Sequence, residues 1–450
     1  MKDDGSNWRA YQKKLQREQR RKTLLQAFPS MILYSGCAIL VLMVVCFGWV
    51  WISEYRSQAS VPPYKVDRQF ALFRDHPTER VILKELNLDP VHLTDHMTLN
   101  NGGTRFTVES TLNPALQHYI MRLVHRARTL KSAVVVMDVH DGRVLAMVSY
   151  DREGNSGDLC LKADFPAASL FKVVSAAAAF ESAGFRPGKT VYYRGKRHTL
   201  YKGQLKKRIG KYTCRTTFKR AFALSINPVF GKLGVYDLGR KTLEEYAGRF
   251  LFNRKIPFDF PVGMSTVHVP EEAFGLAEIA SGFNKRTLIS PLHAALVALV
   301  VANKGIMAAP WLIASIRNGS GQCLYQRRPA VLARCVAPRT AQNLKILMRD
   351  TVIRGTCRKS FLPLRRKRVF KNIELGAKTG TINDVSDRFK YDWLIAYALQ
   401  GKRKRAICVA VLSVHSEKLG IRANELGRYI IGYYYTSRSC APSVRICNGG

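Results

Sequence analysis

The pattern of apolar and polar positions divides the chain into four parts: a polar tail (residues 1–28), an apolar segment (29–52), a mixed segment (53–107) and a long patterned region (108–450). Met31 to Ile52 is a run of 22 residues without a charge, which is long enough to cross a bilayer as one transmembrane helix. The mixed segment contains the helix-breaking Val61-Pro62-Pro63 and is expected to form a short stalk. The patterned region is expected to be the folded domain.

Within this region, the periodicity predicts helices and strands in a definite order. Asn113-Pro114 starts a helix, with Asn as its cap and Pro in its first turn. Asp141-Gly142 is the predicted turn of a hairpin over residues 132–150. Ser290-Pro291 opens a helix that stays apolar through Val301. Three strand candidates and a last helix follow: Glu374–Ile382, Trp393–Leu399, Ile407–Val414 and a helix from about Gly420. Strands at both ends of a helical middle predict an α/β fold.

The polar tail is basic, with eight Lys or Arg residues against three acidic ones. Because a basic flank stays in the cytoplasm, the sequence predicts a single membrane span with the remainder of the chain exported. A cleaved signal peptide is the alternative, although no convincing small-x-small cleavage site directly follows the apolar run.

Cysteine usage fits an exported domain. Eight of the ten cysteines follow the predicted span, and an even number in an oxidising compartment suggests disulfides. Cys160–Cys214 and Cys440–Cys447 are candidate pairs, although sequence leaves the connectivity open. No Cys-x-x-Cys motif is present, so metal binding by the cysteines is not expected.

A candidate nucleophile stands where a long apolar run begins. Ser169 and Lys172 are three residues apart, and Val173 to Phe180 follows. In a helix, positions three apart share a face, so the Lys172 amine is expected to reach the Ser169 hydroxyl. A serine needs an adjacent base, and a lysine is a base only when burial or a second cation lowers its pKa. A capping serine and a surface lysine are the alternative interpretation.

Two later segments strengthen the catalytic interpretation of Ser169 and Lys172. Ser225-Ile226-Asn227 and Lys378-Thr379-Gly380-Thr381 follow in that order. The three segments together resemble the motifs of penicillin-binding proteins and serine β-lactamases. Residues 133–138 with 142–147, 227–230 and 392–398 are also similar to a penicillin-binding transpeptidase, and the resemblance covers about residues 108 to 433. It implies an antiparallel sheet that is built from both ends of the domain and flanked by helices.

The resemblance also implies roles for the motif residues. Ser169 is the nucleophile and Lys172 its base. Asn227 holds Lys172, Ser225 passes a proton to the leaving amine, and Lys378 lowers the pKa of Lys172. The substrate-binding residues are Thr379, Gly380 and Thr381, and the backbone N–H groups of Ser169 and Thr381 form the oxyanion hole. The family needs no metal and no cofactor.

The function that follows is that of a membrane-anchored, monofunctional, class B-like peptidoglycan D,D-transpeptidase of the bacterial inner (plasma) membrane, with its catalytic domain on the periplasmic side. Stem peptides are the expected substrates, β-lactams the expected inhibitors, and a peptidoglycan glycosyltransferase a further expected partner. Alternatives are a D,D-carboxypeptidase or a serine β-lactamase, in which water resolves the acyl-enzyme, and a non-catalytic β-lactam-binding scaffold.

Charge adds one open question. The chain carries 72 basic and 32 acidic residues, a formal net charge of +40. The basic residues are dispersed among apolar elements and no nucleic-acid motif is present, so no nucleic-acid partner is expected. Attraction to anionic lipid or wall polymer, or a merely solvated surface, accounts for the charge instead. Lys206-Lys207-Arg208 and Arg365-Arg366-Lys367-Arg368 are interpreted as solvated loops, with a wall-facing patch as the alternative.

Overall fold

The computed structural model describes residues 86–437 except 155, 402–404 and 417–418, together with isolated positions nearer the N-terminus (13, 14, 16–18, 20, 21, 43 and 83). Two units divide the chain, residues 1–65 and 66–450, and the fold below is that of the second. The expected membrane span falls outside the described residues apart from Met43. Among the residues that are described, no helix combines the length and the apolar character that a membrane crossing requires.

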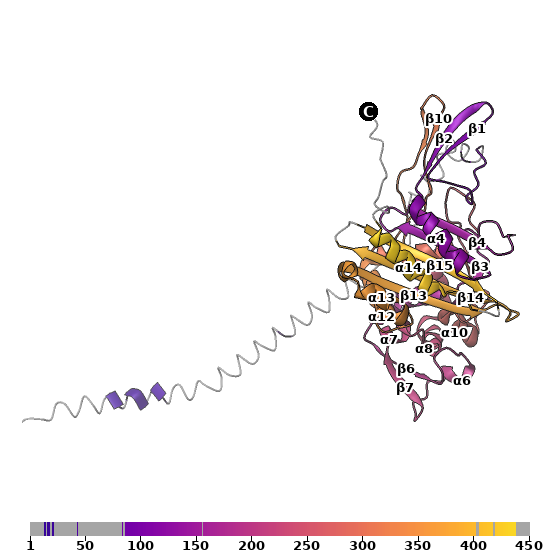
Figure 1. Ribbon diagram of the computed structural model, residues 1–450. Coiled ribbons are helices and arrows are strands. Elements are labelled where there is room, and N and C mark those ends of the chain that lie inside the picture. The colour runs from indigo at the N-terminus through magenta and orange to yellow at the C-terminus, as the bar shows by residue number, and fades with distance from the viewer. Residues whose placement is uncertain are drawn as a thin grey trace, which may run out of the picture. The chain divides into compact units, whose positions relative to one another are not determined.

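A five-stranded antiparallel sheet forms the centre of the folded unit (Figure 1). Its strand order is β13-β14-β15-β3-β4, so the hairpin expected over residues 132–150 pairs with the three strands expected near the end of the chain. The bounds of these strands are β3 (Lys131–Asp138), β4 (Val144–Asp151), β13 (Ile373–Asn383), β14 (Lys390–Gln400) and β15 (Arg405–His415). The predicted α/β fold, an antiparallel sheet joined from both ends, is confirmed.

Helices cover both faces of this sheet. On one face, α4, α13 and α14 contribute to one apolar core with the sheet; on the other, α11 packs on β3, β14 and β15, and α12 packs on β13. All residues of α11 are buried, which explains its unbroken apolar sequence. The helices of these layers are α4 (Pro114–Arg126), α11 (Pro291–Ala302), α12 (Pro338–Ile353), α13 (Arg358–Arg366), η3 (Arg368–Asn372) and α14 (Ala423–Thr436).

Caps place the ends of two of these helices where the sequence predicts them. Asn113 accepts a hydrogen bond from the Leu116 N–H at the start of α4, and Pro114 occupies the first turn. Ser290 accepts from the His293 N–H at the start of α11. Each cap satisfies a backbone donor that the helix itself leaves unpaired.

A predominantly helical subdomain lies between β3–β4 and α11 in the sequence. It contains the segments that carry the motif serines, and a β6–β7 hairpin projects from it at the bottom of Figure 1. Its elements are β5 (Phe165–Pro166), η1 (Ala168–Phe171), α5 (Lys172–Ser182), β6 (Thr190–Arg194), α6 (Lys202–Leu205), β7 (Thr213–Thr217), α7 (Phe218–Ala223), α8 (Asn227–Leu233), η2 (Gly234–Leu238), α9 (Gly239–Arg249), α10 (Ala273–Ser281) and β8 (Leu288–Ile289).

A second sheet, of order β1-β2-β10-β11, stands at the opposite end of this folded unit (Figure 1). Its strands are β1 (His96–Asn101), β2 (Thr104–Ser110), β10 (Ile313–Asn318) and β11 (Cys323–Gln326), and the short β9 (Ile306–Ala308) and β12 (Val331–Arg334) pair nearby. The expected boundary between stalk and domain, at residues 107 and 108, therefore falls inside β2, whose pairing with β10 joins both sides of it.

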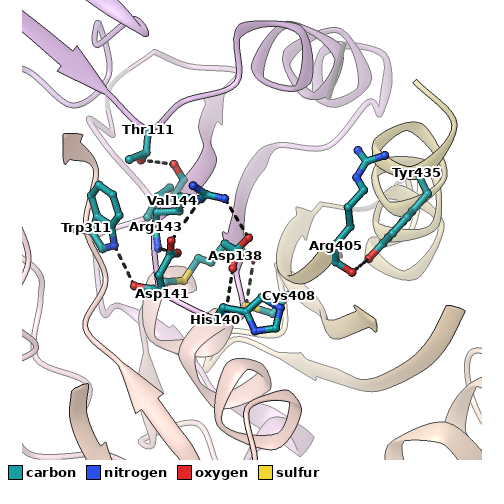
Figure 2. A network of polar contacts seen from close by, with 11 residues as sticks. Thr111, Asp138, His140, Asp141, Arg143, Val144, Trp311, Arg405, Cys408 and Tyr435 are labelled. Atoms are coloured by element: carbon teal, nitrogen blue, oxygen red, sulfur yellow. Dashed lines mark hydrogen bonds and ion pairs between the residues drawn. The ribbon is translucent and has the colours of Figure 1, made fainter. Parts of the chain in front are cut away.

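Polar contacts fix the β3–β4 turn to the segment that leads into β10 (Figure 2). Within the turn, the Arg143 guanidinium donates to Asp138 at 3.4 Å. Trp311 Nε1 donates to the Asp141 carbonyl at 2.9 Å, and the Thr111 hydroxyl donates to the Val144 carbonyl at 2.6 Å. These contacts connect the end of the central sheet to the second sheet.

The disulfide predicted between Cys160 and Cys214 is wrong, because both residues are free thiols. Cys160 is buried against the central sheet, where its thiol donates to the Val134 and Val148 carbonyls. Cys214 is exposed on β7, opposite Tyr193 of β6. The other candidate pair, Cys440–Cys447, lies outside the described residues.

Candidate active site

The nucleophile candidate lies in a tight turn that leads into α5. Ser169 belongs to the 3₁₀ turn η1, and α5 begins at Lys172. The Lys172 amine lies 2.8 Å from the Ser169 hydroxyl oxygen. The preceding residue, Ala168, has a φ of 50°, a left-handed conformation that costs a non-glycine residue about 1–3 kcal/mol and is typical of functional sites. The expected contact between serine and lysine is present, made from a 3₁₀ turn rather than from an α-helical one.

The partners of the Lys172 amine match a neutral base. Besides Ser169, the amine contacts the Asn227 side-chain oxygen at 2.7 Å and the Ser281 carbonyl at 2.5 Å. Both partners only accept, so they take the two N–H donors of a neutral amine and leave its lone pair for the Ser169 hydroxyl proton. Asn227 is itself oriented, because its amide nitrogen donates to the His198 carbonyl.

The electrostatics favour that neutral state. Lys172 is completely buried, at 0% exposure. Burial, and secondly the charge of Lys378, hold the pKa of Lys172 well below its usual range. The amine lies 5.5 Å from the centre of the Phe230 ring, so its surroundings on that side are apolar.

Ser225 and Lys378 form a second serine–lysine pair. The Lys378 amine donates to the Ser225 hydroxyl at 3.0 Å and to the Thr379 carbonyl at 2.7 Å. Burial lowers the pKa of Lys378 to about 7. Ser225 has a φ of 53°, so both candidate catalytic serines adjoin or occupy a left-handed position. The five residues with catalytic roles implied by the resemblance thus form two connected pairs bridged by the Ser225–Asn227 segment.

The outer strand of the central sheet forms one side of the candidate site. β13 is an outermost strand, so one row of its backbone groups is open to a substrate. A Cβ at Gly380 would lie 3.2 Å from the Ala168 Cβ and 3.4 Å from the Ser169 nitrogen. Glycine at this position therefore lets the strand approach the backbone of the nucleophile, which is where the resemblance puts the oxyanion hole.

The two motif threonines already have partners. The Thr379 hydroxyl shares a hydrogen bond with the Thr356 hydroxyl, and the Thr381 hydroxyl donates to the Asp392 carboxylate at 3.1 Å. Asp392 is buried and also accepts two hydrogen bonds from the Arg422 guanidinium. While its proton is donated to Asp392, Thr381 can offer a substrate only its acceptor lone pairs. A substrate carboxylate must therefore turn this hydroxyl away from Asp392 or bind the neighbouring cations.

Arg422 also lines a depression of about 430 Å³. Three more cations, Arg354, Arg358 and Lys359, line it from the turn before α13 and from α13 itself. Sequence reasoning missed this group and missed Ser281. Arg422 acts across 30 residues from Asp392, and Ser281 contributes only a backbone carbonyl, so neither leaves a local pattern.

Gly282, which follows Ser281, is a testable support of the nucleophile. Its φ is +64°, and an added Cβ would lie 2.0 Å from the Ala168 carbonyl oxygen and 3.1 Å from the Ser169 nitrogen. We expect Gly282→Ala to slow acylation of Ser169 by about 100-fold, because small displacements of reacting groups have effects of that size. Gly102→Ala is the matched control, since Gly102 has a φ of +57° but no neighbour within 4 Å of the added Cβ. Equal acylation rates in the two variants would contradict this role.

A serine next to a buried amine base, beside an open strand edge, defines a class of protein: serine enzymes that transfer acyl groups. A family model described as the penicillin binding protein transpeptidase domain matches residues 132–431. This match covers well over half of the chain and includes all of the motif residues above. The chain belongs to the penicillin-binding protein transpeptidase family.

Curated relatives agree with this assignment, and solved structures share the fold. Peptidoglycan D,D-transpeptidase PbpA of Mycolicibacterium smegmatis is 25% identical over 343 residues, which cover 68% of this chain and 67% of the relative. PbpA of Mycobacterium tuberculosis is 26% identical over 351 residues, with the same two shares. The crystal structure of PBPA from M. tuberculosis has a TM-score of 0.59 at 24% identity and covers 72% of this chain and 81% of the other. The D,D-transpeptidase domain from Eggerthella lenta has the same TM-score at 22% identity and covers 72% and 82%.

Proposed function

We propose that this chain is a peptidoglycan D,D-transpeptidase that cross-links stem peptides through an acyl-enzyme at Ser169 and that binds penicillin covalently. The observation that carries the proposal is the Lys172 amine, whose two carbonyl acceptors and one hydroxyl neighbour fit a neutral base. Membership of the family, and the peptidoglycan D,D-transpeptidase activity for which the PbpA relatives are named, support the substrate class.

The reaction has two acyl-transfer steps. Lys172 takes the Ser169 proton as the oxygen attacks the carbonyl of the penultimate D-Ala, and the edge of β13 stabilises the oxyanion. The bond to the terminal D-Ala breaks, and its nitrogen receives a proton through Ser225, which Lys378 holds at 3.0 Å. An amine of a second stem peptide then attacks the ester, forms the cross-link and releases Ser169.

Slow hydrolysis of the ester is part of the proposal. A β-lactamase needs a base that activates water, and four carboxylates between the second and third motifs are candidates. Three of them lie at the surface in ion pairs: Glu244 and Glu271 with Arg240, and Glu245 with Arg249. Glu272 stands just before α10 and is exposed. The penicilloyl ester should therefore last for many minutes.

The test combines mass spectrometry with a product assay on the full chain. Isotopically labelled penicillin should add its own mass to the protein, and the labelled adduct should persist after an excess of unlabelled drug is added. A stem peptide ending in D-Ala-D-Ala, with an acceptor amine present, should yield a cross-linked dimer and free D-Ala. Free D-Ala without dimer would indicate a carboxypeptidase, rapid loss of label with drug hydrolysis a β-lactamase, and no label on folded protein a non-catalytic scaffold.

Membrane anchoring extends the proposal to the N-terminal part of the chain. The support is the sequence itself, a basic tail followed by the charge-free run from Met31 to Ile52, which favours one span with the catalytic domain outside. A reporter that is active only outside the cytoplasm, fused after Gly450, should be active. A stably expressed but silent fusion would refute this orientation.

A further inference from the structure

One segment of the fold concentrates positive charge without any compensating acid of its own. Residues 186–220, here called the basic lobe, contain thirteen Lys and Arg residues and no Asp or Glu. The lobe begins after α5, forms the β6–β7 hairpin with α6 between its strands, and ends in α7. Figure 1 shows the hairpin projecting from one end of the folded unit. About a third of the formal net charge of +40 thus comes from 35 of 450 residues.

Most of this charge faces solvent. Ten of the thirteen cations are exposed, and eight of these lie between residues 196 and 215: Lys196, Arg197, Lys202, Lys206, Lys207, Arg208, Lys211 and Arg215. Among the described residues, none of the ion pairs to a carboxylate involves any of these eight. Asp237 of η2 also lies near the lobe; burial raises its pKa, and the charges of Lys189 and Lys207 oppose this rise. The lobe therefore presents a strongly positive surface.

Its exposed apolar groups are mainly aromatic. Tyr192, Tyr201 and Tyr212 are 39%, 52% and 70% exposed, and Ile209 is the single aliphatic residue among the large exposed side chains of the lobe. A membrane-inserting loop would need more aliphatic surface than one isoleucine. Planar phenol rings between cations suit a hydrated polymer that carries both sugar rings and negative charges.

The lobe is joined directly to the active site. The Arg197 carbonyl accepts from the Asn227 backbone N–H at 2.7 Å, and the His198 carbonyl accepts from the Asn227 side chain at 3.0 Å. Burial lowers the pKa of His198. A polymer held on the lobe thus lies next to the residues that position the base.

A depression of about 500 Å³ at the base of the hairpin offers a site for a single anionic group. Its cations are Arg215, Lys219, Arg220 and Arg354, joined by three threonines of the two strands and by Asp350. Asp350 is buried and paired with Arg354, so the cations outnumber it. Guanidinium groups beside hydroxyls are well suited to carboxylates.

We propose that the basic lobe is a docking surface for uncross-linked peptidoglycan strands, which it binds through the carboxylates of their stem peptides. This inference rests on the proposed function, since that function supplies the polymer. The lobe raises the local concentration of stem peptides at the site, while Ser169 and Lys172 perform the chemistry.

The test uses the full chain and immobilised uncross-linked strands on a biosensor. The variant Lys206→Gln/Lys207→Gln/Arg208→Gln removes three charges from the lobe, and Arg365→Gln/Arg366→Gln/Lys367→Gln removes three exposed charges from the end of α13. We expect the lobe variant to bind about tenfold more weakly and the control variant to bind like the parent, with a salt dependence that only the parent and the control retain. Both variants should be acylated by penicillin at the parent rate.

Each other outcome has a defined meaning. Unchanged binding of the lobe variant, or an equal loss in both variants, would overturn the proposal. So would undiminished binding to strands whose carboxylates have been amidated, or stronger lobe-dependent binding to phosphatidylglycerol vesicles than to strands. Absence of acylation in the parent protein would refute the proposed function instead, whatever the strands do.

Discussion

Ser169→Ala is expected to abolish covalent labelling by penicillin, and Lys172→Arg to slow it by about 10³-fold, within the range that general-base catalysis contributes. The first change removes the atom that forms the ester. The second removes the proton acceptor, because a guanidinium stays protonated under all ordinary conditions. Its larger planar group must also fit among the Ser169, Asn227 and Ser281 oxygens that surround the present amine.

Labelling rates with a fluorescent penicillin, measured on folded protein, test both changes. Lys172→Met distinguishes base from structural support, because methionine has a similar length, no charge and no lone pair of comparable basicity. It should fold with a modest loss of stability, because the side chain keeps its length while the Asn227 and Ser281 oxygens each lose one hydrogen-bond donor, and it should label as slowly as the arginine variant. Labelling of Lys172→Arg at the parent rate would assign the base to another group.

The second large effect is a fall in the acylation rate above neutral pH, caused by Lys378. Burial lowers the pKa of Lys378 to about 7, and its charge helps to keep Lys172 neutral. Lys172 and Lys378 titrate as a coupled pair. The acylation rate should rise with pH as the pair loses its first proton, mainly from Lys172, and should fall as the pair loses its second proton, from Lys378, near pH 7. Without its charge, Lys378 no longer attracts an anionic substrate.

Stability should move in the opposite direction. The pKa of Lys378 is lower in the folded chain than in the unfolded chain, so between about pH 7 and about pH 10 the unfolded chain binds more protons. The free energy of unfolding therefore rises with pH over that window while the acylation rate falls.

Acylation and urea-unfolding profiles against pH separate the two trends. Lys378→Arg keeps its charge throughout, so it should lose the falling limb of the rate together with the part of the rise in stability that Lys378 contributes, while the part from Lys172 remains. A parent rate that climbs steadily to pH 9 would mean that the charge of Lys378 is not required.

Much of the fold followed from local signals. The Asn113 and Ser290 caps and the Asp141-Gly142 turn lie where the pattern predicts them, because each satisfies a nearby backbone group or supplies a φ that its neighbours cannot. The strands of the sheet were also recognisable, since both faces of the sheet are covered and their sequences are continuously apolar.

The residues of the candidate site could be predicted from the sequence, but several of the hydrogen bonds and ion pairs around them could not. Ser169 and Lys172 are close in sequence, so their contact follows from spacing. The Ser281 carbonyl, 109 residues from Lys172, has no side-chain signature at all. Thr381 donates to Asp392, which is paired with Arg422. That ion pair depends on how the start of α14 packs against β14, and a hydrophobic periodicity does not predict the packing of two particular elements. The Cys160–Cys214 prediction was wrong because it rested on an even number of cysteines, and that number does not indicate which cysteines lie close together in the fold.

The strand order of the central sheet also determines when, during synthesis of the chain, the sheet can form. β3 pairs with β15, with Val134 opposite Val411, so the first hairpin of the domain leaves the ribosome long before its partner strand exists. Contacts of such long range form slowly, and apolar strands that wait for partners are prone to aggregate. The nucleophile is made early and the Lys378 strand late, which means that no partial chain ending before β13 can attack a substrate. Activity begins only when nearly the whole domain has been synthesised and folded.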